Sequence, residues 1–105
     1  MVAQQSFQEI MSTQRHLILP SNHPFYQKID RIVKRLENHV HDLVSGERPK
    51  FHVFVLNNPE PNAFVLPGGQ IFVNVGLSNI AKSEDELATV LAHEVKYSNL
   101  TLFNL

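Results

Sequence analysis

The sequence predicts an α+β fold in which helices pack on a small, mostly antiparallel sheet that contains a hairpin. Apolar residues recur every three or four positions in the stretches 25–43 and 84–95, which is typical of amphipathic helices. Between them lie three short runs rich in β-branched and aromatic residues, at 51–56, 63–66 and 70–75, separated by turn-forming sequences. A chain of 105 residues is long enough for one small domain.

The helical stretches are bounded by helix-breaking and capping residues. A short helix is predicted over residues 6–16, and Pro20 and Pro24 then interrupt the chain. The helix over 25–43 ends before Gly46, and Pro49 prevents it from resuming. The third helix is predicted to run from about Glu84 to beyond Glu94, and Ser83 before it forms a capping-box pattern with Glu86. Its apolar positions are Leu87, Val90, Leu91 and Val95.

The last two of the three apolar runs predict a hairpin. Pro67-Gly68-Gly69 between them is a tight-turn sequence, and residues 70–75 alternate in the manner of a strand. A sheet this small leaves at least one edge open, where another strand can pair.

Composition excludes several classes of function. The chain is 43% hydrophobic and 18% charged, with a formal net charge of −1 and no concentrated basic segment, so nucleic acid is not an expected partner. The absence of cysteine excludes disulfides and thiolate metal sites. No apolar run approaches the ~20 residues that cross a bilayer, so no transmembrane segment is expected.

His93-Glu94 on the third helix is the pair that indicates chemistry. In the pattern His-Glu-x-x-His, two imidazoles one helical turn apart bind zinc and the glutamate acts as general base. The pair alone is weak support, because a surface histidine beside a solvated carboxylate is commoner. An unrelated α+β domain with an accidental His-Glu is therefore one reading of the chain.

A longer series of motifs changes this assessment. Residues 62–73 (NAFVLPGGQIFV), Gly76-Leu77, residues 84–88 (EDELA) and residues 91–95 (LAHEV) follow one another in order. The series resembles the gluzincin zinc metalloendopeptidases, the family of the CAAX prenyl protease and HtpX. Residues 18–24 (ILPSNHP) narrow the likeness to the branch of the mitochondrial inner-membrane stress protease whose activity overlaps that of the m-AAA protease.

The resemblance implies a zincin-like fold and roles for particular residues. His93 matches the first zinc ligand and Glu94 the general base. Residues 1–95 match the N-terminal part of a metallopeptidase domain, and residues 96–105 form a divergent tail. The strand Gln70, Ile71, Phe72, Val73, Asn74 resembles the edge strand that pairs with an extended polypeptide substrate, although plain sheet core is an equal reading. The resemblance also implies zinc as cofactor and the mitochondrial inner membrane as location.

The sequence departs from the family pattern after Val95. Tyr97 stands at the position of the second histidine, and a phenol must lose a proton with a pKa of about 10 before it binds zinc. No candidate for the third ligand, a glutamate in the family, follows it. His39 and His41 diverge on their helix, and His16, His23 and His52 are not expected to replace the missing ligand.

We therefore expect a chain cut off within its zinc-binding helix, inactive and without stably bound zinc. The alternative function is a non-catalytic module that binds a peptide or partner subunit at an open sheet edge. Loss of the helices that should follow predicts exposure of Leu87, Val90 and Leu91, and with it marginal stability and self-association. The divergent tail is consistent with a retained intron, a frameshift or an alternative exon.

Overall fold

The computed structural model describes residues 7–43 and 50–102. Within these ranges the helices and strands follow the predicted order, and each predicted helix and strand is present. Two 3-10 helices, η2 and η3, were not predicted. The elements are α1 (Phe7–Gln14), η2 (Arg15–Leu17), α2 (Pro24–Leu43), β1 (His52–Leu56), β2 (Ala63–Val65), β3 (Gln70–Asn74), η3 (Val75–Asn79) and α3 (Glu84–Leu102). No helix in these ranges is long and apolar enough to span a membrane.

The sheet formed by the described strands has the order β1-β3-β2. β2 and β3 are antiparallel, which confirms the hairpin, whereas β1 and β3 run parallel. The α+β class is confirmed, but the sheet is mixed rather than mostly antiparallel. The reason lies in residues 57–62, which carry the chain from β1 to the far edge before the hairpin returns it to the middle.

The prediction that Gln70–Asn74 forms a substrate-binding edge strand is wrong. β3 is the central strand, paired over Gln70–Asn74 with β1 and over Ile71–Val73 with β2. Its backbone groups are therefore committed to its two neighbours, and they are not open to a peptide. The outer strands of the described sheet are β1 and β2.

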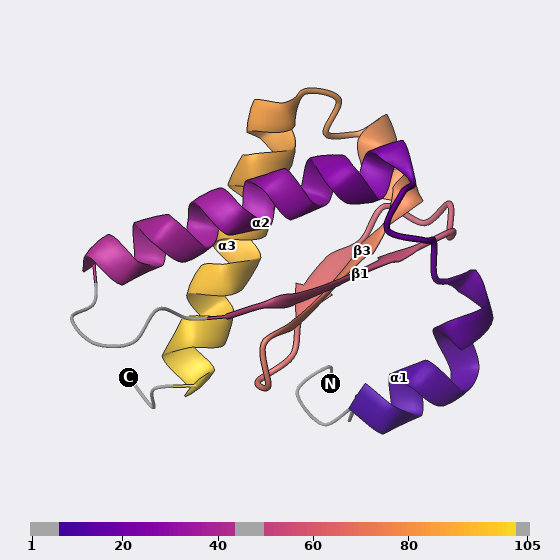
Figure 1. Ribbon diagram of the computed structural model, residues 1–105, viewed down its shortest axis with the longest axis horizontal. Coiled ribbons are helices and arrows are strands. Elements are labelled where there is room, and N and C mark those ends of the chain that lie inside the picture. Colours follow the sequence, from indigo (N-terminus) through magenta and orange to yellow (C-terminus); the bar gives the residue numbers. More distant parts are fainter. Residues whose placement is uncertain (1–6, 44–49, 103–105) are drawn as a thin grey trace.

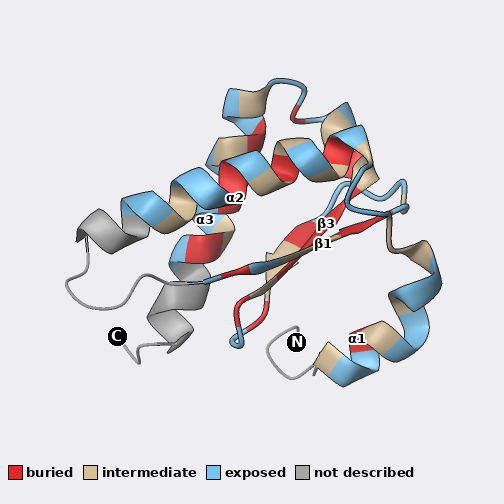
Figure 2. Ribbon diagram, viewed as in Figure 1, coloured by how far each residue is buried: buried red, intermediate tan, exposed pale blue. Residues whose placement is uncertain are grey.

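Helices cover both faces of the sheet (Figure 1). α2 packs on β1 and α3 packs on β2, and the two helices also contact each other. Ile71 and Val73 of β3 face these helices and are completely buried. Figure 2 shows the buried residues along the strands and the helix surfaces that face them. The largest helix contributions to this layer come from Ile29, Ile32, Val33, Leu87, Leu91 and Val95.

The burial of α3 contradicts the expected exposure of its apolar residues. Leu87 is 1% exposed and Leu91 is fully buried, because the sheet and α2 cover them, and Val90 is half-buried. Among the described residues the large hydrophobic side chain that remains exposed is Ile80, at 63%. Self-association and marginal stability stay predictions.

The opposite face of the sheet carries an aromatic cluster under α1. Phe72 of β3 stacks between Phe54 of β1 and Phe64 of β2, with ring centroids 5.1 and 5.2 Å apart. The ring centroid of Phe7, in α1, lies 5.4 Å from that of Phe54. Ile10 of α1 is buried in the same cluster. Offset aromatic pairs at these separations add to the apolar area that they bury.

A close backbone contact positions the loop before β2. The N–H of Gly76, in η3, donates a hydrogen bond to the carbonyl of Asn58 at 3.0 Å. A Cβ at Gly76 would overlap the carbonyl oxygen of Pro59 and crowd the backbone of Glu60. Only glycine allows this approach, which holds residues 57–62 against the segment that leads to α3.

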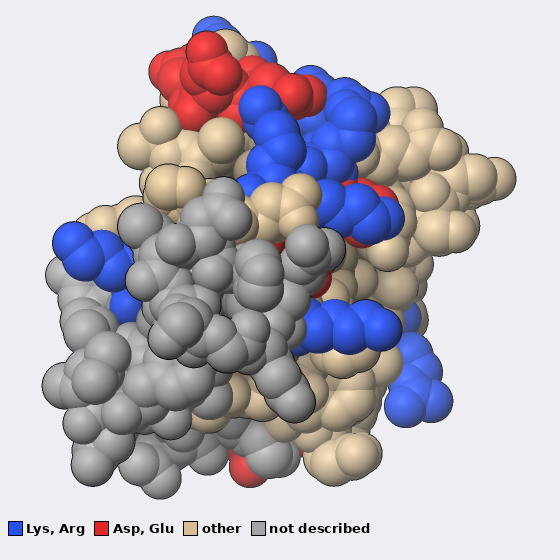
Figure 3. Space-filling view, turned by 60° about the vertical axis from the view of Figure 1, so that its left-hand side comes forward, with Lys and Arg blue, Asp and Glu red and all other residues tan. Residues whose placement is uncertain are grey.

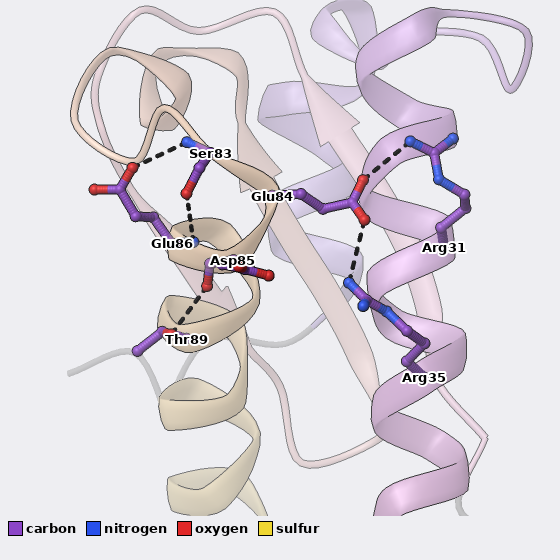
Figure 4. A network of polar contacts seen from close by, with 7 residues as sticks. All are labelled: Arg31, Arg35, Ser83, Glu84, Asp85, Glu86 and Thr89. Carbon is purple, nitrogen blue, oxygen red and sulfur yellow. Dashed lines mark hydrogen bonds and ion pairs between the residues drawn. The ribbon is translucent and has the colours of Figure 1, made fainter.

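The capping box predicted at the start of α3 is present (Figure 4). The N–H of Glu86 donates to Ser83 Oγ at 3.0 Å, and the N–H of Ser83 donates to Glu86 Oε1 at 3.0 Å. Hydrogen bonding to the carboxylate, first by the Ser83 backbone N–H and then by the Ser83 side chain, lowers the pKa of the Glu86 carboxyl below its usual value. The box satisfies backbone donors that have no partner within the helix.

Two arginines of α2 hold the first turn of α3. Arg31 and Arg35 contact the carboxylate of Glu84 at 3.1 and 3.3 Å. Figure 3 shows a band of basic side chains beside an acidic group on this face of the molecule. The arginine side chains are 60% and 59% exposed, so each pair contributes no more than about 1 kcal/mol. They connect the surface of α2 to the first turn of α3 (Figure 4).

The Gly76 contact gives the first prediction. Gly76→Ala forces the loop away from η3 and should lower the free energy of unfolding by about 1–3 kcal/mol. Gly68→Ala is the matched control, because its Cβ meets only the flexible end of the Gln70 side chain; it should change stability by less than about 0.5 kcal/mol. Urea unfolding followed by circular dichroism measures both. Equal effects of the two substitutions would contradict the role given to Gly76.

The capping box predicts a pH dependence of stability. A folded-state pKa below the unfolded value, about 4.3 for glutamate, stabilises the fold above that value. The stabilisation is lost as the pH falls through the folded-state pKa. Glu86→Gln should therefore lower the urea midpoint at pH 7 but much less at pH 3. Asp85→Asn controls for loss of a charge in the same helical turn, and a Glu86→Gln effect independent of pH would refute the prediction.

Candidate functional site

His93 and Glu94 lie on α3 between two residues that anchor the helix to the core. Leu91 and Val95 are buried, whereas His93 is exposed and Glu94 is half-buried. The helical repeat explains this difference, because Leu87, Leu91 and Val95 follow one another at intervals of four and occupy one face. His93 is turned away from that face and is accessible from solvent.

Position 97 lies one helical turn beyond His93. α3 runs without a break from Glu84 to Leu102, so residues 93 and 97 are neighbours on the helix surface. The sequence places a tyrosine there. Its side chain lies outside the described part of the chain, as does the end of the expected divergent tail at 103–105.

The side chains that the structure describes do not form a complete zinc site. Among them, no group of three His, Cys, Asp or Glu is placed to hold a metal ion. A catalytic zinc requires three protein ligands, and His93 supplies one. The described residues therefore do not by themselves complete the set of three ligands.

The remaining described histidines have other positions. Nδ1 of His23 accepts a hydrogen bond from the N–H of Phe25 at 3.1 Å and so caps the start of α2. His16, in η2, is exposed, His39 lies on α2 and His52 on β1, also exposed. The side chain of His41 lies outside the described set. These histidines lie outside α3 in the sequence.

The open sheet edge next to α3 belongs to β2. The N–H of Asn74 donates to the carbonyl of Asn62 at 3.0 Å, and the N–H of Leu66 donates to the carbonyl of Gln70 at 2.8 Å. Antiparallel hydrogen bonds alternate along a strand, so Ala63 and Val65 direct their backbone groups away from β3. The N–H of Ala63 is met by Asn62 Oδ1 at 3.0 Å. Its carbonyl and both groups of Val65 face the outer edge, where no described strand pairs with them.

The outer edge of β1 is partly occupied. The N–H of Leu19 donates to the carbonyl of Val55 at 2.8 Å, and the N–H of Asn57 donates to the carbonyl of Leu17 at 2.8 Å. The segment after η2 therefore covers the end of β1. Since α3 packs on β2, a peptide added to the β2 edge extends the sheet on the side of the His93-bearing helix.

The role of β2 was missed in the sequence, although a signal was present. Ile71, Phe72 and Val73 are consecutive and apolar, which is typical of a strand buried on both faces. That pattern favours a central position for β3 and leaves the short β2 run at the edge.

Comparison with known proteins supports the sequence resemblance. The model of peptidase family M48 matches residues 26–96. The mitochondrial metalloendopeptidase OMA1 of Schizosaccharomyces pombe is 42% identical over 97 residues, which cover 91% of this chain and 27% of that protein. OMA1 of Saccharomyces cerevisiae is 34% identical over 96 residues, covering 85% and 28%. The β-barrel assembly-enhancing protease of Escherichia coli is 34% identical over 71 residues, covering 68% and 14%.

The chain spans between a seventh and little more than a quarter of the length of these relatives. The matched region nevertheless includes most of α2, the whole described sheet and the part of α3 that carries His93 and Glu94. The motifs that suggested the gluzincin family therefore lie largely within the matched region, and the chain belongs to peptidase family M48.

Proposed function

We propose that this chain is part of a metalloendopeptidase that hydrolyses polypeptides. The observation that carries the proposal is the packing of the His93-Glu94 helix on the open edge strand β2 in a chain of family M48. His93 is the proposed metal ligand, and Glu94 is the proposed base that takes the proton of the attacking water. Zinc is the expected metal, because imidazole and carboxylate ligands suit it.

We propose further that the chain with Tyr97 binds zinc weakly and does not hydrolyse peptides by itself. The sequence offers a phenol where a second imidazole is needed, and a phenol binds zinc only after it loses its proton. The names of the OMA1 relatives support a mitochondrial location, with the inner membrane as the expected compartment. Residues 96–105 remain proposed as a tail that departs from the metallopeptidase domain of residues 1–95.

A second candidate function is peptide or subunit binding without catalysis. The backbone groups of Ala63 and Val65 at the outer edge of β2 favour it, because they offer hydrogen bonds to an extended chain whether or not zinc is bound. The two functions share this edge and differ in their need for metal.

Restoring the histidine gives the test of the zinc proposal. Tyr97→His places two imidazoles one turn apart and should increase zinc affinity at least about tenfold, since even supporting residues of zinc sites contribute 10–100-fold. Competition with a chromophoric chelator measures the affinity. The original chain should show no chelator-sensitive hydrolysis of casein.

The control is the double variant His93→Ala with Tyr97→His, which should return to the affinity of the original chain. Equal zinc affinity of the original chain and Tyr97→His would contradict the role of position 97. Hydrolysis of casein by the original chain, stopped by chelator, would refute the proposed inactivity.

The β2 edge is tested by removing one donor. Val65→Pro removes an outward-facing backbone N–H. An edge strand tolerates proline at such a position. It should weaken binding of fluorescent, unfolded casein fragments at least about tenfold in the presence of chelator. Fluorescence anisotropy measures the affinity, and circular dichroism checks that the variant is folded.

Val65→Thr is the matched control, because it keeps the N–H and the β-branched shape. It should bind like the original chain. Failure of the original chain to bind, or equal binding by Val65→Pro, would remove support for the β2 edge as the peptide site.

A further inference from the structure

A pocket lies on the α1 side of the sheet, away from α3. Its volume is about 170 Å³, and it is bounded by α1 and by the residues around the ends of the strands. Ile10, Leu56 and Phe64 give it an apolar wall. A cavity of about 150 Å³ holds a molecule the size of benzene, so this pocket has room for a small organic group as well as for water.

Asn74 is the residue that the fold leaves unexplained. It follows Phe72 on the same face of β3 and lines the pocket. It is 6% exposed, yet its side chain forms no hydrogen bond within the described part of the chain. A buried amide without a partner destabilises a protein, and buried polar groups in native structures are nearly always satisfied. Its partner is therefore supplied from the pocket, by water or by a bound group.

The other polar residues of the pocket limit what that partner can be. Asn58 Oδ1 accepts the N–H of Glu60 at 2.9 Å, and Asn62 Oδ1 accepts the N–H of Ala63 at 3.0 Å. Both side chains line the pocket, and what they can still offer is their NH₂ donors. These donors can pair with an acceptor on a ligand.

Acceptors for the ligand are also present. Glu60 contributes a carboxylate, and Gln14 contributes an amide. Within the described part of the chain, no lysine or arginine lines the pocket. An anionic ligand would meet the Glu60 charge without a compensating cation, and an ammonium ion would leave the asparagine donors unpaired.

We propose that this pocket binds a carboxamide group. A carboxamide donates and accepts at once, so it satisfies Asn74 and the NH₂ groups of Asn58 and Asn62 together, and its short alkyl part lies along Leu56 and Phe64. The group belongs either to a free small amide or to the glutamine or asparagine side chain of a polypeptide. The site is on the opposite face of the sheet from α3 and is independent of peptidase activity.

The test is a nuclear magnetic resonance titration of the ¹⁵N-labelled 105-residue chain with propionamide. The side-chain NH₂ signals of Asn58, Asn62 and Asn74 should shift and saturate. Propionate and propylammonium, which match propionamide in size, should bind at least about tenfold more weakly, because each leaves pocket groups unpaired. Absence of saturable shifts with propionamide, or equal binding of the two ions, would overturn the proposal.

Contacts of the ligand locate the site without a variant. Nuclear Overhauser effects should connect the methyl group of propionamide to Leu56 and Phe64, and effects to other regions alone would refute the assignment. Asn74→Leu should abolish binding. Asn79→Leu, the same change at an exposed position, should not. Retained binding in a folded Asn74→Leu chain would count against the pocket.

Two pentapeptides distinguish the sources of the carboxamide. One has glutamine at its centre and glycine elsewhere, and the other has glutamate in place of glutamine. Tighter binding of the glutamine peptide than of propionamide assigns the group to a polypeptide side chain, whereas weaker binding assigns it to a free small amide. Equal binding of the glutamine and glutamate peptides would overturn carboxamide recognition.

Discussion

The burial of β3 on both of its faces is the constraint on which the rest of the structure depends. Ile71 and Val73 require a cover on one side of the sheet, and Phe72 requires one on the other. α2 and α3 satisfy the first demand, and α1 satisfies the second. Because β1 and β2 must flank the same strand, they become the outer strands of the described sheet. The position of the open edge is therefore a consequence of core packing.

This packing also brings the edge and the helix of the candidate site together. α3 buries Leu87, Leu91 and Val95 beneath the sheet, which turns His93 outward while it keeps the helix against β2. The close approach at Gly76 holds the loop before β2 to the segment that leads into α3. The Arg31, Arg35 and Glu84 contacts then orient the first turn of α3 (Figure 4). Each contact is local, and all of them lie in the segments that connect the sheet to α3 or α2 to α3.

The sequence predicted the helices and the hairpin, because these depend on local patterns. It did not predict which strand lies at the edge, because that depends on the order of the strands in the sheet. The apolar stripe of α2 and the Ser83–Glu86 box identify their helices, and Pro67-Gly68-Gly69 identifies the hairpin. The assignment of Gln70–Asn74 to an edge was wrong, because a hairpin does not reveal which of its strands meets β1. Asn74 is the related case. The alternation of side chains along the strand places Asn74 on the same face of β3 as Phe72. Only the assembled sheet shows that this face is buried and that no described side chain pairs with the amide.

Family membership and metal binding depend on different parts of the chain. Membership of family M48 rests on residues 26–96 as a whole, whereas metal binding depends on a few side chains in one turn of α3. The described buried face of α3 is formed by other positions, namely Leu87, Leu91 and Val95. The proposed peptide pairing at β2 depends on backbone groups. The proposed carboxamide site lies on the opposite face of the sheet from α3. Both proposed activities are therefore independent of metal binding.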